Sequence, residues 1–168
     1  MARKPADKKE TAKNKKEKSF EQTLWDTADK LRGTVESSEY KHVVLSLIFL
    51  KFVSDTFEQR KQQLIDEGQG DYVDMVEFYT MKNVFYLPEA AQYSHLLQLP
   101  EGADLGRAVS DAMEAIEDDN PELRGILPRD YSRVTNPTLA TLLRTFSDIP
   151  MDIEGDVFGR IYEYFLGK

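Results

Sequence analysis

The chain has 168 residues, of which 40% are hydrophobic and 31% charged, and its net charge at pH 7 is -8. This length and composition predict one folded domain with a single core and a highly charged surface. Cysteine is absent, which excludes disulfides, thiolate nucleophiles, iron–sulfur clusters and cysteine zinc sites. The longest apolar run, residues 43–50, is too short to span a bilayer, and the charged start of the chain leads into no apolar stretch typical of an export signal. We therefore expect a cytoplasmic protein without a membrane segment.

The first 18 residues differ in charge from the rest of the chain. They hold eight basic and three acidic side chains, so this tail carries +5 and the remainder carries -13. Because the tail has almost nothing to bury, we expect it to be disordered, with any attraction to phosphate independent of sequence and weakened by salt. Two interpretations stay open: a solvated leader, or a segment directed to DNA whose candidate contacts are Lys8, Lys9, Lys15 and Lys16.

Two helices are predicted after the tail. The first covers about residues 19–32, because Ser19 is a good capping residue, apolar residues then recur on one face, and Gly33 ends the pattern. The second covers about residues 39–67 and ends at Gly68. Its first half has too many apolar residues for one stripe and must be covered on several sides. Its second half is charged, and we expect it to project toward the surface.

Between residues 70 and 100 the pattern is less regular. We predict helix over residues 72–81 and again over residues 89–97. Residues 83–88 form a short extended segment, because the residue before a proline avoids helical geometry. The predicted fold class is therefore mainly α, a multi-helix domain with at most this short extended or β segment.

The C-terminal part contains three further helix starts. Asp104 is a capping residue before apolar positions at helical spacing. Asn120-Pro121 and Asn136-Pro137 each place a capping residue before a proline at the first helical position, so a short helix is predicted after both. A final helix with one apolar side is predicted over residues 156–166.

Residues that carry chemistry are sparse. The two histidines, His42 and His95, lack metal-ligand spacing and are expected at surface or boundary positions. The acidic residues within 114–119 lack the calcium-loop pattern, and we interpret them as a solvated helix end. Phosphate-binding loops, dinucleotide glycine motifs and nucleophile elbows are absent, and Asn136-Pro137-Thr138 lacks the second proline and the aromatic of an adenine methyltransferase motif. We therefore assign no catalytic residue, no cofactor-binding residue and no metal ligand.

One long segment, residues 39–55, has the sequence EYKHVVLSLIFLKFVSD. It is preceded by Leu24-Trp25 and followed, in order, by distinctive blocks at residues 85–89, 116–123 and 156–166. Together these blocks resemble the modification subunits of type I restriction-modification systems, over about residues 19–168. Tyr93 departs from the tryptophan of many relatives, but an aromatic ring is retained, so we expect little effect on packing.

The resemblance implies a role within a longer polypeptide. In that family a helical N-terminal domain precedes a domain that binds S-adenosylmethionine and methylates adenine at N6 in duplex DNA, which would follow Lys168 here. The implied partners are DNA, a specificity subunit and a second modification subunit, joined in the full restriction enzyme by motor-nuclease subunits. Residues 19–168 are then expected to have no activity alone and to contribute DNA clamping and subunit assembly.

Clamping of DNA requires exposed cations, because a body of net charge -13 repels DNA unless its basic residues cluster. The candidates for DNA or partner contacts on the predicted long helix are Lys41, Lys51, Arg60 and Lys61. Surface solvation with ion pairing inside the helix is the alternative for each of them. The alternative for the whole chain is a free-standing helical module that binds a protein partner without contacting DNA.

Overall fold

The computed structural model describes residues 19–125, 127–149, 151 and 157–167. Within these ranges the chain forms helices and no β-strand, which confirms the mainly α class. Of the predicted extended segment, residues 83–88, Asn83 lies in a turn with a φ of +58°, whereas residues 84–88 form neither helix nor strand and Pro88 has an extended backbone. None of the described helices combines the length and apolar character needed to cross a bilayer. The basic tail, with its four candidate lysines and its predicted disorder, lies outside the described residues.

The first two helices begin and end close to the predicted positions. α2 (Phe20–Lys30) follows Ser19, whose hydroxyl accepts a backbone N–H of the first turn at 3.1 Å. α3 (Ser37–Asp66) ends two residues before Gly68, which adopts a φ of +79°. That left-handed conformation costs glycine little and allows the next N–H to bond back to the last turn. With 30 residues, α3 is a rod about 45 Å long.

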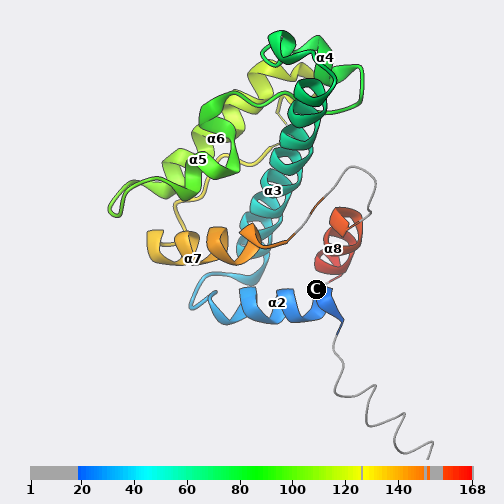
Figure 1. Ribbon diagram of the computed structural model, residues 1–168. Coiled ribbons are helices and arrows are strands. Elements are labelled where there is room, and N and C mark those ends of the chain that lie inside the picture. The colour runs from blue at the N-terminus through cyan, green and yellow to red at the C-terminus, as the bar shows by residue number, and fades with distance from the viewer. Residues whose placement is uncertain (1–18, 126, 150, 152–156, 168) are drawn as a thin grey trace, which may run out of the picture.

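α3 runs through the molecule, and the other helices pack around it (Figure 1). α8 (Val157–Leu166) packs against both α2 and α3, and α7 (Asn136–Ser147) also crosses α3. This first half of α3 is covered on several sides, as predicted, with Val44, Leu47 and Ile48 fully buried. We call α2, α7, α8 and the first half of α3 the base of the molecule.

The far end of α3 is covered by short turns instead of a helix. The predicted helix over residues 72–81 is wrong as a continuous element, because the chain forms a 3₁₀ turn, η1 (Gly70–Tyr72), and one α-helical turn, α4 (Glu77–Thr80). The expectation that the charged second half of α3 projects toward the surface is also wrong in part, since Arg60 is buried. We call residues 62–81 the tip, which lies at the opposite end of the molecule from α2 (Figure 1).

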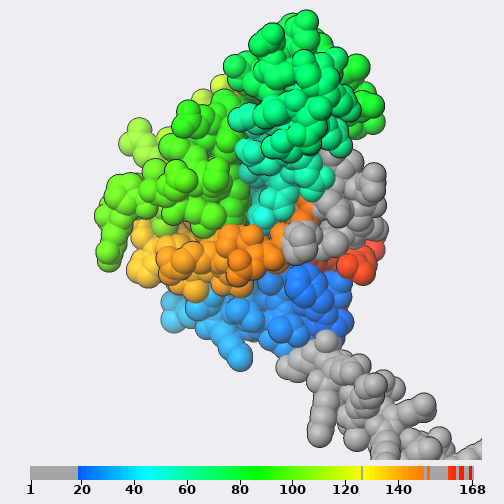
Figure 2. Space-filling view, in the orientation of Figure 1, coloured from blue at the N-terminus to red at the C-terminus, as the bar shows by residue number. Residues whose placement is uncertain are grey.

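Between base and tip, a second layer of helices lies beside α3. It consists of η2 (Glu89–Ala91), α5 (Tyr93–Leu97), α6 (Leu105–Asp119) and η3 (Pro121–Leu123). α6 begins at Asp104, as predicted, where the carboxylate accepts a first-turn N–H at 3.1 Å. In the space-filling view, α7 forms a band between α2 and the α5–α6 layer (Figure 2).

Asn120 and Asn136 do not cap helices with their side chains, which corrects the prediction for both. The Asn120 amide donates to the carbonyl of Tyr86 at 2.9 Å and accepts the N–H of the same residue at 3.3 Å. Asn136 is already inside α7, and its amide bonds Leu105 N–H at 3.2 Å and Ala103 O at 3.1 Å. A carboxamide both donates and accepts, so each asparagine joins two segments that are distant in sequence.

Candidate nucleic-acid and partner interface

Lys51, a candidate contact residue, is buried in an ion pair. Its Nζ lies 2.7 Å from both carboxylate oxygens of Asp55, one turn further along α3, and only 8% of the residue is exposed. One of those oxygens also accepts the N–H of Met151 at 3.2 Å. The pair therefore fastens the chain after α7 to α3, and the expectation that Lys51 presents a surface charge is wrong.

Two buried tyrosines, Tyr40 of the segment 39–55 and Tyr93, act as further joints between helices. The Tyr40 hydroxyl donates to the carbonyl of Ala28 and so ties α3 to α2. The Tyr93 hydroxyl donates to the carbonyl of Leu143 in α7, and the Tyr93 N–H donates to Ser54 at 2.9 Å. Burial raises the pKa of Tyr40 to about 12, and burial together with nearby Asp55 raises the pKa of Tyr93. Both hydroxyls therefore keep their protons and remain donors at neutral pH.

Tyr93 is the position at which the sequence resemblance led us to expect a tryptophan. Its ring is buried, and Lys51 Nζ lies 5.8 Å from the ring centre. An aromatic side chain thus fills the site, as expected, and the hydroxyl adds a hydrogen bond to α7.

Arg60 is likewise enclosed, so the surface role predicted for it is wrong. Its Nε–H donates to the carbonyl of Phe78 at 2.7 Å, and 3% of the residue is exposed. Lys41 and Lys61 are half-buried on α3, at the base side and the tip side respectively. The four α3 candidates therefore do not form one exposed basic stripe.

Exposed cations at the base were missed by the sequence reasoning. Arg133 lies 3.3 Å from Glu39, and Arg160 lies 3.6 Å from Glu21, each with more than half of its side chain exposed. Exposed pairs of this kind are weak, so both guanidinium groups remain accessible to another anion. The sequence carried no usable signal for them, because one precedes α7 and the other lies on α8, and only folding brings both to the base.

Glu117 corrects the expectation of a wholly solvated acidic helix end. Its residue is 4% exposed, and one carboxylate oxygen accepts a hydrogen bond from Arg129 at 2.6 Å. That bond, opposed by burial, lowers the pKa of Glu117. The neighbouring Glu114 and Asp118 are exposed, as predicted. Arg129 thus holds the loop before α7 against α6.

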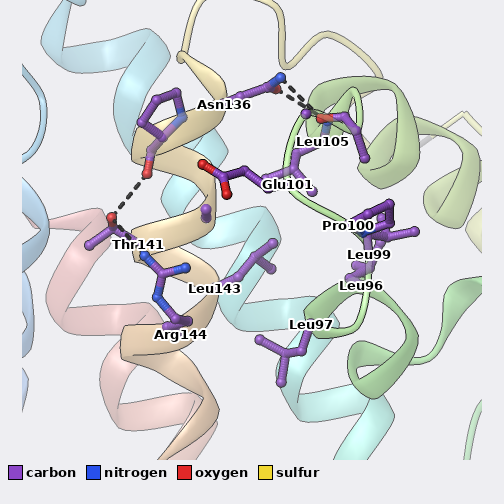
Figure 3. A pocket seen from close by; sticks show the side chains of 14 residues that line it. Leu96, Leu97, Leu99, Pro100, Glu101, Leu105, Asn136, Thr141, Leu143 and Arg144 are labelled. Atoms are coloured by element: carbon purple, nitrogen blue, oxygen red, sulfur yellow. Dashed lines mark hydrogen bonds between the residues drawn. The ribbon is translucent and has the colours of Figure 1, made fainter.

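A groove of about 730 Å³ lies between α7 and the α5–α6 loop (Figure 3). Asn136 closes one end through its two bonds to the α6 start, drawn as dashed lines (Figure 3). Arg144 and Glu101 place opposite charges on its two walls. Most of the remaining lining is apolar: Leu96, Leu97, Leu99, Pro100, Ala103, Leu105, Pro137, Ala140 and Leu143.

The histidines lie where they are expected, with His42 exposed and His95 half-buried. Across the residues with described positions, no group of three His, Asp or Glu side chains is arranged to hold a metal ion. What the structure brings together is a set of buried joints, a base with exposed arginines, and an acidic tip.

Comparison with known families shows to which class of protein this helical domain belongs. The chain belongs to the HsdM N-terminal domain family, whose model matches residues 20–146. This confirms the resemblance inferred from the motif blocks.

Two relatives define the similarity further. The chain is 32% identical over 169 aligned residues to the type I restriction enzyme MjaIX methylase subunit of Methanocaldococcus jannaschii, covering 89% of this chain and 30% of that protein. It is 34% identical over 86 residues to the type I restriction enzyme HindI methylase subunit of Haemophilus influenzae, covering 42% of this chain and 19% of that protein. The chain thus spans less than a third of the length of either relative.

Proposed function

We propose that this chain is the non-catalytic N-terminal part of a type I DNA N6-adenine methyltransferase subunit, contributing DNA clamping and subunit assembly. The observation that carries the proposal is the family match over most of the chain, to proteins named as methylase subunits. S-adenosylmethionine serves as methyl donor for the parent subunit, at a site outside this segment. The parent assembly contains a specificity subunit, a second modification subunit and, in the full restriction enzyme, motor-nuclease subunits, in the cytoplasm.

The base is the end that we assign to DNA. α2 lies there and directly follows the tail, whose net charge is +5. Arg133 and Arg160 are exposed at the same end. Removal of adenine from the duplex stack has an energetic cost, which backbone contacts on a clamping arm offset. Contacts from lysine and arginine to phosphate fit that task, since they require no base recognition.

A salt titration of DNA binding tests this assignment. The full chain is compared with the quadruple variant Lys8→Gln, Lys9→Gln, Lys15→Gln, Lys16→Gln by fluorescence anisotropy with a labelled duplex. We expect weak binding by the unaltered chain and at least about a tenfold loss in the variant at low salt, with a shallower dependence on salt concentration.

The matched control is Lys61→Gln with Lys82→Gln, which removes cations beside the acidic tip and should leave DNA affinity nearly unchanged. Equal affinity of the unaltered chain and the quadruple tail variant would remove the tail from the proposal. Absence of DNA binding by both would favour the alternative function, a helical module that binds a protein partner without DNA contact.

A further inference from the structure

The tip contains a three-residue repeat that helical patterns do not predict. Most backbone hydrogen bonds in this segment join residues three apart: Met75 N–H bonds Tyr72 O at 3.0 Å, and Phe78 N–H bonds Met75 O at 3.1 Å. In such turns the side chains at positions i and i+3 lie above one another. Two of the three positions in the repeat form sets of like residues on the outer side of the tip. The acidic stripe consists of Asp71, Asp74 and Glu77, and the apolar stripe consists of Tyr72, Met75, Phe78 and Met81.

The apolar stripe is accessible to solvent. Tyr72, Met75 and Met81 are 42%, 44% and 64% exposed, which is unusual for large apolar side chains so close together in one segment. The Tyr72 ring stacks on the Phe78 ring with 4.7 Å between the ring centres, so these two members of the stripe are in direct contact. The acidic stripe beside it is fully on the surface.

The stripes are held from beneath by buried groups. Tyr79, from the third set of the repeat, is fully buried, and its hydroxyl donates to Val73 O at 2.6 Å while its ring stacks on Phe57 of α3. Arg60 donates to Phe78 O at 2.7 Å, and its guanidinium lies 3.9 Å from the sulfur of Met81. The surface is therefore preorganised, which lowers the ordering cost of binding.

The charge of the tip selects the kind of partner. Residues 62–81 contain five acidic residues and no lysine, arginine or histidine. Phosphate is repelled from such a surface, whereas a cationic protein segment is attracted to it. The tip lies at the end of the molecule opposite α2 (Figure 1), so the end assigned to DNA stays separate.

We infer that the tip is a docking surface for a basic amphipathic helix of a partner subunit. Apolar side chains at helical spacing on that helix would contact the apolar stripe, and its lysines or arginines would flank the acidic stripe. The two methionines suit this role, because their flexible thioethers adapt to the shape of an incoming side chain. The basic tail of this chain matches the charge but offers only Met1 as a large apolar residue.

The test uses three labelled peptides of equal length. The probe is a synthetic helix with leucines on one face and lysines on the other. One control replaces its lysines by glutamate, and the other is residues 1–18 of this chain, which is basic but almost without apolar side chains. We expect the leucine–lysine helix to bind the full chain at least about tenfold more tightly than either control.

Matched variants locate the binding site. Met75→Ser with Met81→Ser, and separately Asp74→Asn with Glu77→Gln, should each weaken binding of the leucine–lysine helix by about tenfold. The controls alter exposed residues elsewhere: Phe20→Ser, and Asp118→Asn with Glu122→Gln. These control variants should bind like the unaltered chain.

The inference deepens the assembly part of the proposed function, and its failure is distinguishable because the peptide assay contains no DNA. Equal effects of tip and control variants would overturn it. It would also be overturned by preferential binding of the 1–18 peptide, or by self-association of the chain that the Met75→Ser, Met81→Ser variant abolishes in sedimentation velocity, since the occupant would then be this chain itself.

Discussion

The base and the tip are built on opposite halves of the same helix, and they differ in how that helix is covered. Around the first half of α3, α7 and α8 pack directly on the helix, apolar side chains such as Leu47 are buried, and the Lys51–Asp55 pair fastens the following chain. Over the second half, a single segment of short turns covers Arg60 and Leu64 and leaves large apolar side chains exposed. The base resembles the core of a domain, whereas the tip resembles a surface that this core supports. Segments with few buried contacts, such as the tip, open at lower free energy than a core does.

The largest expected effect comes from breaking the base. Asp55→Ala leaves the Lys51 ammonium buried without its partner and removes the acceptor of the Met151 N–H. We expect the free energy of unfolding to fall by about 3 kcal/mol. This value is at the lower end of the range for breaking a buried ion pair, because Asp55 is partly exposed. Urea denaturation followed by circular dichroism measures it.

The double variant Lys51→Met, Asp55→Leu is the control for that experiment. It removes both charges and replaces them with apolar side chains, so it should lose less stability than Asp55→Ala alone. If the single variant unfolds at the urea concentration of the unaltered chain, the pair does not fasten the base.

An intermediate effect with a defined pH dependence is expected for Arg129→Met, at the loop that packs on α6. The pKa of Glu117 is lowered from 4.5, first by the hydrogen bond from Arg129. A carboxyl group with a lowered folded pKa stabilises the fold above its unfolded pKa, and this stabilisation is lost as the pH falls through the folded value. The variant should therefore lose about 1.5 kcal/mol at neutral pH, and its difference from the unaltered chain should shrink as the pH falls below 4.5.

Arg107→Met is the matched control for this pH series. Arg107 lies 4.0 Å from Asp111, and both side chains are largely exposed. Its removal should change neither the stability nor the pH profile measurably. A stability difference for Arg129→Met that is constant from neutral to acidic pH would contradict the assignment to Glu117.

The smallest effect compares a hydroxyl at the tip with one that bonds to the base. Tyr79→Phe at the tip, and Tyr93→Phe in α5, whose hydroxyl donates to α7 of the base, each remove a hydroxyl that donates to a backbone carbonyl, with an expected loss of about 1 kcal/mol. Hydrogen–deuterium exchange should separate them. Exchange should increase for Tyr79→Phe mainly within residues 72–83, but for Tyr93→Phe across α3, α5 and α7 together. The same distribution of exchange in both variants would show that tip and base open as one unit.

Several elements were predictable because their signals are local. The Ser19 and Asp104 caps and the Gly68 termination depend on residues within one turn of the helix end, and all three occur as predicted. The covered first half of α3 followed from an excess of apolar residues. The helix predicted over residues 72–81 is wrong because most backbone hydrogen bonds of this segment join residues three apart, which is not the spacing of an α-helix.

The candidate site was less predictable, because the charge of a side chain does not indicate whether the side chain is buried or exposed in the fold. Lys51 and Arg60 have the sequence properties of surface residues, yet each finds a buried acceptor. Asn120 and Asn136 have the sequence properties of caps, yet their amides join segments more than thirty residues apart. Such assignments depend on partners that only the folded chain supplies.

The sequence by itself determined the helical class, most helix ends and, through the order of its motif blocks, the family. These features are carried by local backbone preferences and by apolar periodicity, which act within one or two turns. Only the tertiary structure decided which cations are buried, which acids are paired, and that α3 has a closed base and an open tip. The physical reason is that burial and pairing arise between two segments in contact. The local conformational preference of one segment does not specify which other segment it contacts.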